Sequence, residues 1–533
     1  MDDSGATIEQ DVRFSESILW KLQRQYYDLR GPQAWASGAV PSYVTTNPYI
    51  AHVYAHIVLA YLRDAAASLD RERPIYIVEL AAGSGRFAYL FLKAFHALKN
   101  ASSVRALDVR YVMTDFTRAN VRAWAAQPAF KPFLDAGLLD LGIFDAERDR
   151  EIQLVGARGG VLAAGGLANP SIVLANYAFD TLVQDLFRVE NGKLHEVRVS
   201  LRSRQAQPDL SRPEIMSELQ CRYANREIGA AYYDDPGLNA MLEGYRASLA
   251  ETTFAVPIGA FTALRNLIDI AGGRLLLLSS DKGYTHEDEL YGVNQQPIEF
   301  HGSLSMMVNY HALGQYIAGQ GGLYAATSPR QAGLKTAALI LGGSAAQFTD
   351  TLLAFRERAD VFGPYDLFNV LANLRKDAPT ISPDHFLGLL RLSHFDPYIV
   401  HQFARDVVGT LAGAPEVLRM EIRLALDRVQ ENYYPVGNDL PFELARLYMA
   451  LKRPLDGLRL LHQSIELFGE NAATYVNMGL CHYYAENPPA ALRCFDRAIE
   501  LSPDFAVARA WRARVTAEIE RLGAGFTGAA PPR

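Results

Sequence analysis

The stretch Ile75-Tyr-Ile-Val-Glu79-Leu-Ala-Ala-Gly83-Ser-Gly85-Arg-Phe87 decides the fold of this chain. Apolar and β-branched residues run into an acid, two glycines follow among small residues, and residues 87–98 carry apolar side chains at helical spacing. This order predicts a strand, a tight turn and a helix, which is the opening unit of an α/β nucleotide-binding sheet. The glycines would let a ligand lie against the backbone, where the first amides of the helix can face it.

Glu79 separates two classes of cofactor that use such a turn. The residues from Gly83 to Ala88 fit the G-x-G-x-x-G/A pattern of dinucleotide sites, although this match is weak by itself. A carboxylate at the end of the strand would repel a pyrophosphate, and it suits a cation without phosphate, such as S-adenosylmethionine. An acid, a small residue and G-x-G resemble motif I of class I methyltransferases, with Ala81 in place of the usual first glycine. An ordinary tight turn is the alternative.

Two further acids end predicted strands on the way to the next helices. Asp115 follows residues 109–114, and a carboxylate there can accept both ribose hydroxyls of a nucleoside. Asp145 follows residues 138–144, where class I methyltransferases place an acid near the adenine amine. A turn-forming Asp115 and a helix N-cap at Asp145 are the alternatives, but the joint spacing with Glu79 favours a cofactor site. The predicted cofactor-binding residues are Glu79, Ala81, Gly83, Gly85, Asp115, Phe116, Asp145, Ala146 and Asn176.

A fourth predicted strand, residues 171–175, runs into Asn176-Tyr-Ala-Phe-Asp180. Because the carboxyl ends of parallel strands face the ligand crevice, these residues should line the substrate side of the site. Asn176, Tyr177 and Asp180 are therefore the candidate catalytic residues. Asp180 could orient or deprotonate a methyl acceptor, and a helix N-cap is an equal alternative for it.

Other segments of the first 345 residues carry weaker signals. Residues 187–199 alternate in polarity around Asn191-Gly192, which predicts a hairpin inserted on the sheet as a cover for the pocket. Residues 205–255 have a mixed, mostly helical pattern. The remaining expected elements are a loose end over 1–12, helices over 16–28 and 49–67 around a turn-rich aromatic loop, buried strands over 274–281 and 335–341, and a helix within 303–321.

Beyond residue 346 the strand signals stop and helical periodicity takes over. The step of 34 positions from Ala445 to Gly479 is the period of a tetratricopeptide repeat. The later repeat has an aromatic at its fourth place, small residues where two helices cross and a closing proline: Ala472, Tyr475, Met478, Gly479, Ala491, Phe495, Ala498 and Pro503. We therefore predict a sheet domain over 1–345, a helical region over 346–437, tetratricopeptide repeats over 438–522 and a disordered tail over 523–533.

Residues 20–345 resemble the MidA-like family of class I methyltransferases, the group of the mitochondrial complex I assembly arginine methyltransferase. Beyond motif I, three ordered stretches carry the likeness: Gln25-Tyr-Tyr with residues 44–50, residues 175–187, and residues 308–322. The resemblance implies the class I fold and S-adenosylmethionine as cofactor. The family's glutamate after the asparagine is Tyr177 here, and the aspartate of its Val-Asp-Phe stretch is Asn309. Because carboxylates grip a guanidinium in a forked geometry, both changes weaken the inference of arginine as the substrate.

Composition excludes several other classes of protein. The 533 residues carry a formal charge of −7, which leaves no basic footprint for nucleic acid. No apolar run approaches the roughly 20 residues that cross a bilayer, and the acidic start is unlike a signal peptide. Three cysteines without paired spacing favour a reducing cytoplasm. Neither a zinc motif around His286 nor a nucleophile elbow at Ser84 is complete, so no metal is expected.

The sequence thus predicts a cytoplasmic, S-adenosylmethionine-dependent methyltransferase joined to a helical repeat domain. A protein side chain is the expected acceptor, because such repeats bind peptides along a concave face; an oligomeric state is left open. The alternative is a degenerate methyltransferase that acts as a binding or assembly protein through its repeats, which Ala81 and Tyr177 favour. A nicotinamide oxidoreductase is a third reading, and Glu79 argues against it.

Overall fold

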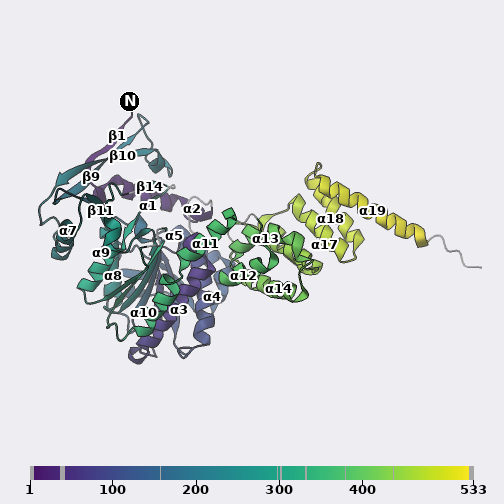
Figure 1. Ribbon diagram of the computed structural model, residues 1–533, viewed down its shortest axis with the longest axis horizontal. Coiled ribbons are helices and arrows are strands. Elements are labelled where there is room, and N and C mark those ends of the chain that lie inside the picture. Colours follow the sequence, from purple (N-terminus) through teal and green to yellow (C-terminus); the bar gives the residue numbers. More distant parts are fainter. Residues whose placement is uncertain are drawn as a thin grey trace, which may run out of the picture. The chain divides into compact units, whose positions relative to one another are not determined.

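The computed structural model describes residues 5–36, 43–156, 158–296, 298–300, 303–329, 333–377, 380–435 and 437–526 (Figure 1). Contacts divide the chain into two compact units, Met1–Leu371 and Ala372–Arg533, called here the sheet unit and the helical unit. No helix in the described part of the chain is long and apolar enough to cross a membrane.

The sheet unit is built on a nine-stranded sheet with the order β17-β18-β12-β7-β2-β3-β4-β5-β6. The five strands from β12 to β4 run parallel, whereas β18 is antiparallel to both of its neighbours. Chain order reverses between β2 and β7, which is where open α/β sheets form their ligand crevice. The strands are β2 (Ile75–Glu79), β3 (Val109–Asp115), β4 (Leu139–Ile143), β5 (Glu151–Leu154), β6 (Val161–Ala163), β7 (Ser171–Asn176), β12 (Leu275–Asp281), β17 (Leu323–Ala326) and β18 (Lys335–Leu341).

The central strands form because their apolar runs are buried on both faces. Every residue of β12 and β18 is buried, as expected when helices cover both faces of a sheet. Helix α3 starts where Asn47 Oδ1 accepts a hydrogen bond from Ile50 N, with Pro48 as its first residue. The flanking helices are α3 (Pro48–Ala65), α4 (Arg86–Asn100), α5 (Arg118–Ala126), α8 (Ile258–Ile270) and α9 (Tyr310–Gly319).

The predicted fold class is confirmed: a Rossmann-like α/β domain with a mostly parallel central sheet precedes an all-helical region. The antiparallel β18 distinguishes this sheet from the all-parallel dinucleotide-binding fold with its order 3-2-1-4-5-6. The predicted strands at 75–79 and 335–341 have these same bounds in the structure.

A second, antiparallel sheet is larger than the predicted hairpin. Its strands are β1 (Thr7–Arg13), β8 (Asp185–Glu190), β9 (Lys193–Ser203), β10 (Leu219–Glu227) and β11 (Thr252–Val256). The β8–β9 hairpin turns at Asn191-Gly192, whose φ values of 52° and 71° suit a type I′ turn. The loose end predicted over residues 1–12 is wrong for β1, and the mostly helical reading of 205–255 is wrong for β10 and β11. β1 is mostly polar and its register with β9 shifts twice, so its alternation is irregular. β10 does alternate over Leu219, Cys221 and Tyr223, and β11 is a short buried run, so the helical reading overlooked both signals.

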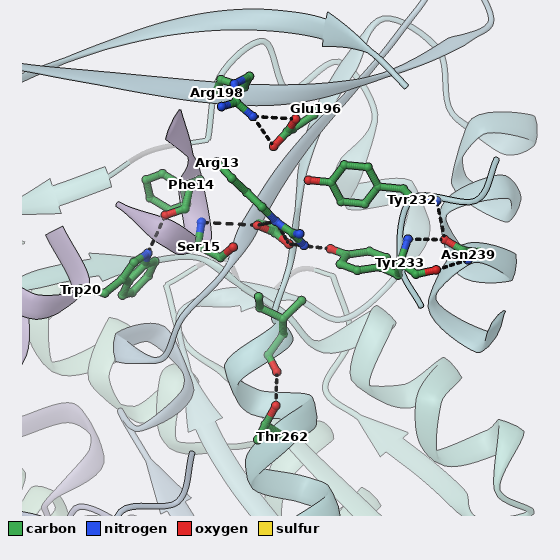
Figure 2. Close-up of polar contacts among 12 residues, drawn as sticks. Arg13, Phe14, Ser15, Trp20, Glu196, Arg198, Tyr232, Tyr233, Asn239 and Thr262 are labelled. Atoms are coloured by element: carbon green, nitrogen blue, oxygen red, sulfur yellow. Dashed lines mark hydrogen bonds and ion pairs between the residues drawn. The ribbon is translucent and has the colours of Figure 1, made fainter. Parts of the chain in front are cut away.

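One ion pair fixes the first strand to this sheet (Figure 2). Arg13 Nε donates to Asp185 Oδ1 at 2.9 Å and to Oδ2 at 3.1 Å, and Tyr233 Oη donates to the same Oδ2 at 2.8 Å. The guanidinium carbon lies 4.7 Å from the ring centroid of Tyr232 and 5.2 Å from that of Tyr233. Forked carboxylate bonding and stacking on aromatic faces are both specific to arginine, so Arg13 anchors β1.

The sheet unit continues past the predicted domain boundary at 345/346 because the next helices pack against α3. Phe348 stacks on Tyr61 with 5.3 Å between ring centroids. At the start of α10 (Thr349–Phe355), Thr351 donates from its backbone N and its hydroxyl to Asp64 Oδ2 at 2.8 and 2.7 Å. A π-helical turn (Arg356–Asp360) follows, and α11 spans Pro364–Asp377. The compact unit therefore ends at Leu371.

The helical unit consists of short antiparallel helices. Its last pairs show the crossing expected of tetratricopeptide repeats: a Cβ on Gly479 would lie 2.5 Å from the Phe495 ring, so only glycine lets α17 and α18 approach. Helix α19 continues through Phe526, so residues 523–526 of the predicted tail are helical and 527–533 lie outside the described residues. The helices are α12 (Pro383–Leu392), α13 (Pro397–Leu411), α14 (Glu416–Glu431), α15 (Leu440–Ala450), α16 (Pro454–Phe468), α17 (Ala472–Tyr484), α18 (Pro488–Leu501) and α19 (Ala506–Phe526).

The packing of α10 on α3 can be tested with one substitution at a buried position and one at an exposed position nearby. Phe348→Ala removes a buried ring that stacks on Tyr61, so we expect the free energy of unfolding of the sheet unit to fall by about 3–5 kcal/mol. Leu353→Ala, within α10 and 55% exposed, should change it by less than about 0.5 kcal/mol. Urea denaturation of the full chain measures both. Equal effects would show that residues 348–355 are not part of the sheet unit's core.

Candidate functional site

A cavity of about 450 Å³ opens at the carboxyl ends of β2, β3, β4 and β7. This volume lies within the roughly 300–1,000 Å³ of small-molecule sites, and the position is the switch point of the sheet. Nine of the predicted site residues line it: Glu79, Ala81, Gly83, Asp115, Phe116, Asp145, Ala146, Asn176 and Tyr177. Gly85 and Asp180, which were also predicted, are not among its lining residues.

The glycine turn has a left-handed backbone at three positions. Ala81, Gly83 and Gly85 have φ values of 49°, 54° and 78°. A Cβ on Gly85 would lie 3.0 Å from the Phe130 ring, so this glycine allows close packing of the turn against its own domain. A Cβ on Gly83 would point at the Trp35 indole, 3.0 Å away, on the cavity side. Of the two glycines, Gly83 is the one that a ligand would meet.

Glu79 is a buried carboxyl group at the floor of the cavity. Its Oε2 accepts a hydrogen bond of 2.9 Å from Tyr111 Oη. Burial raises the pKa of Glu79 to about 8, and the charge of nearby Asp115 acts in the same direction, whereas the Tyr111 hydrogen bond opposes them. An unpaired carboxylate in so dry a place is costly. A bound cation would remove this cost by pairing with the ionised form.

Asp115 combines the two roles that its sequence position allowed. Its Oδ1 accepts from Thr117 N at 2.8 Å and from Thr117 Oγ1 at 2.6 Å, and its Oδ2 accepts from Asn120 Nδ2 at 2.9 Å. These bonds build the turn into α5, so the turn-forming reading is correct. Asp115 also lines the cavity. Each carboxylate oxygen has two lone pairs, and Oδ2, with a single protein donor here, retains capacity for a ligand hydroxyl.

Phe116 follows β3 and Asp145 follows β4, and in the sheet both strands lie on the other side of β2 from β7, which ends at Asn176. Asp145 Oδ2 accepts a hydrogen bond from Arg24 Nη2, and the Arg24 guanidinium carbon lies 4.6 Å from the Phe116 ring centroid. The helix N-cap alternative for Asp145 is wrong, because β5 follows it and no helix begins there. Its carbonyl instead accepts from the amides of Arg148 and Asp149, which closes a turn.

Asn176 and Tyr177 shape the acceptor side at the end of β7. Asn176 Oδ1 accepts from Tyr54 Oη at 2.7 Å and from Ser280 N at 3.2 Å, and its Nδ2 donates to Thr45 O at 3.3 Å. These bonds tie the end of β7 to α3, to β12 and to the backbone of Thr45, so Asn176 holds the cavity wall together. Tyr177 has a φ of 46°, a conformation rare for a residue with a side chain. Such strain at a cavity wall favours a functional role for this turn.

Asp180 lies behind the cavity wall. It is 6% exposed, and it sits within the short helix Phe179–Thr181, whose N-cap position belongs to Ala178, so the N-cap alternative is wrong. Its amide donates to Asp281 Oδ2 at 3.1 Å, and each of the two buried carboxyl groups influences the pKa of the other. Burial raises the pKa of Asp281 well above its usual range, and the charge of Asp180 raises it further. Two such groups cannot both ionise, so the pair holds a proton.

The sequence prediction missed the residues that cover the cavity. Trp20, Gln23, Arg24 and Tyr27 of α1 (Ile18–Arg30) line it, together with Trp35 of α2 (Gln33–Ala36). Their spacing of 3, 4 and 7 residues along α1 places the four on one helical face. This stripe could have been read from the sequence beside the apolar stripe that includes Leu19, Leu22 and Tyr26.

The inserted sheet covers the pocket only indirectly. No residue of its described strands lines the cavity. Val199 and Leu201 of β9 instead share a core with Leu19 and Leu22 of α1. The sheet therefore supports the helix that covers the cavity, which corrects the prediction that the hairpin itself is the cover.

The raised pKa of Glu79 gives a pH dependence with a definite sign. A ligand cation near this carboxylate favours its ionised form, so binding below pH 8 must release a proton. We expect the association constant of S-adenosylhomocysteine to rise from pH 6 to pH 8, by up to about tenfold per pH unit. Calorimetric titrations measure the trend, and Glu79→Gln, which has no proton to lose, should flatten it. An equal slope in the variant would remove Glu79 as the source.

The chain is similar to known proteins in its fold and in its repeat region. A solved structure of an uncharacterised protein from Burkholderia thailandensis is similar with a TM-score of 0.40 and 16% identity, over 63% of this chain and 90% of that one. A second structure from that organism, which contains bound S-adenosyl-homocysteine, has a TM-score of 0.39 and 15% identity over the same shares. No curated protein matches the chain. Residues 472–505 match the family model described as tetratricopeptide repeat, which confirms the predicted repeat in that range.

Proposed function

We propose that this chain is an S-adenosylmethionine-dependent methyltransferase. The observation that carries the proposal is the buried carboxyl group of Glu79 at the floor of the cavity, directly before the glycine turn. A sulfonium or ammonium ion satisfies this group without adding negative charge. Asp115 would then accept a ribose hydroxyl, and Phe116 with Asp145 would hold the adenine.

A dinucleotide fits this cavity poorly. Its pyrophosphate would lie against Glu79 and Asp115, both of which are acids. The basic side chains among the described lining residues are Arg24 and Arg148, and both lie beside Asp145. The charge of the cavity therefore selects against phosphate and for a cation.

The chemistry of methyl transfer needs little from the protein beyond placement. The cofactor supplies an electrophilic methyl group, and the protein must hold a nucleophile in line with it. In this proposal the wall formed by Asn176 and Tyr177 positions the acceptor. The Asp180–Asp281 pair would adjust the charge behind that wall, since it can take up or release one proton.

The proposed acceptor is a protein side chain, and the proposed role of the helical unit is to recognise that protein. The repeat at residues 472–505 supports this assignment, because stacked repeats of this kind form extended binding surfaces. Three free cysteines are compatible with the proposed cytoplasmic location.

A second candidate is a binding protein that has kept the cofactor fold without the reaction. The position of Asp180 favours it, because this candidate base lies outside the set of lining residues. Incubation of the full chain with labelled S-adenosylmethionine and a cell lysate as the source of acceptor proteins decides between the enzyme and the binding protein. Transfer of label supports the enzyme, and cofactor binding without any transfer supports the binding protein.

The cofactor assignment is tested by calorimetric titration of the full chain with S-adenosylhomocysteine and with NADH. We expect S-adenosylhomocysteine to bind and NADH to give no heat, because Glu79 and Asp115 face the place where a pyrophosphate would lie. Binding of NADH with no response to S-adenosylhomocysteine would overturn the assignment.

Gly83→Ala should weaken the binding of S-adenosylhomocysteine by at least about tenfold, because a Cβ blocks the approach of the ligand to the turn. Gly165→Ala is the matched control: it also has a positive φ, of 68°, but nothing lies within 4 Å of its added Cβ. Both substitutions impose similar backbone strain, so a loss of affinity confined to Gly83→Ala assigns the effect to the cavity. Equal affinity in the two variants would place the ligand elsewhere.

Asp115→Asn keeps the shape of the side chain and removes its charge. A hydrogen bond to a charged group contributes roughly 1.5–3 kcal/mol, so its loss should weaken S-adenosylhomocysteine binding by about ten- to a hundredfold. Asp140→Asn is the control, since Asp140 is a buried acid on β4 that is not among the cavity's lining residues. Calorimetry at one pH compares the two. An equal effect of both changes would point to general loss of structure.

A further inference from the structure

Arg24 lies between the two residues assigned to the adenine. Its guanidinium carbon is 4.6 Å from the ring centroid of Phe116, and its Nη2 donates to Asp145 Oδ2. All three side chains line the cavity. A flat group that stacks on an aromatic ring and donates an N–H to a carboxylate is also what adenine and its exocyclic amine would offer. Arg24 thus makes, from within the chain, both contacts that the nucleobase would make.

We propose that Arg24 is a specificity-determining residue that fills the nucleobase end of the cavity until a ligand displaces it. This inference rests on the proposed function for the identity of the ligand. A ring can stack on the Phe116 face that Arg24 covers only after the guanidinium has left it. An amine can take the place of Nη2 on Asp145 only under the same condition. A ligand that replaces one contact and not the other leaves Asp145 or Phe116 without its partner, so the arrangement selects a flat ring with an N–H donor.

The displaced guanidinium has other carboxylates within reach. Arg24 Nη1 already lies 3.7 Å from Glu147 Oε2. Asp28 stands one turn further along α1; burial raises the pKa of this group, and the charge of Arg24 opposes the shift. Moving from Asp145 to either acid exchanges one ion pair for another. The movement therefore needs no unpaired charge in a half-buried place.

Arg148 provides a natural comparison for Arg24. It lies 3.7 Å from the same Asp145 Oδ2, but its side chain is 69% exposed, whereas that of Arg24 is 23% exposed. No stacking of Arg148 on a ring is found among the described residues. Both arginines place a positive charge beside Asp145, and Arg24 alone covers Phe116. A comparison of the two separates the effect of charge from the effect of occupying the site.

The test measures the affinities of adenosine, S-adenosylhomocysteine and homocysteine for the full chain and for Arg24→Ala, Arg24→Lys and Arg148→Ala. Removal of the competitor frees the subsite, so Arg24→Ala should bind adenosine and S-adenosylhomocysteine about tenfold more tightly than the native chain. Homocysteine has no ring, and its affinity should not change. Arg24→Lys keeps the charge without the flat stacking group, so its affinity for adenosine should fall between those of the native chain and Arg24→Ala. Arg148 also lines the cavity and places a charge beside Asp145, so Arg148→Ala measures the effect of charge alone, and its change in adenosine affinity should be smaller than that of Arg24→Ala.

Weaker adenosine binding by Arg24→Ala would overturn the inference, because Arg24 would then be part of the bound site. An unchanged affinity would overturn it as well, and so would a failure of every variant to bind adenosine. If Arg24→Ala does not fold, as judged by its thermal transition, the Arg24→Lys result decides. Tighter adenosine binding together with no binding of S-adenosylhomocysteine to any variant would uphold the role of Arg24 and refute the proposed cofactor.

Discussion

The site depends on one buried carboxyl group at the end of the first central strand. Glu79 ends β2 at the switch point of the sheet, and the turn that follows it places Gly83 beside the same cavity. Among the described residues, Tyr111 is the one that donates a hydrogen bond to this carboxyl group. Burial therefore dominates the pKa of Glu79, and the group resists ionisation. A site built around such a group favours a ligand that brings its own positive charge.

The remaining elements serve to enclose this position. Arg13 fixes β1 to the second sheet through Asp185, and that sheet packs against the apolar face of α1. The neighbouring stripe of α1 then covers the cavity with Trp20, Gln23, Arg24 and Tyr27. The cover is therefore held by contacts far from the cavity, while its own residues touch the ligand position. Arg24 shows how such a cover can also compete with the ligand.

The sequence predicted the central sheet and many of the residues that line the cavity, because both depend on local patterns. Buried parallel strands such as β12 are continuous apolar runs in the sequence. An acid directly after such a run, such as Asp115, marks the end of the strand. Much of the second sheet was missed because long-range pairing with β9 holds β1 and β10 in place.

The sequence also could not predict which contacts a residue makes with distant segments of the chain. Asp180 follows a strand whose end faces the cavity, yet it is not among the lining residues, and its backbone amide donates to Asp281, more than a hundred positions later. Likewise, the domain boundary moved to Leu371 because Phe348 packs on Tyr61, a contact between distant segments. Neither pairing leaves a local pattern that a single sequence could reveal.

A crystal structure of the chain with S-adenosylhomocysteine tests the central claim most directly. The account predicts the amino acid end of the ligand beside Glu79 and Gly83, a ribose hydroxyl on Asp115 and the adenine on the Phe116 face that Arg24 now covers. A ligand bound outside this cavity, or one whose adenine lies away from Phe116 and Asp145 with Arg24 still in place, would contradict it.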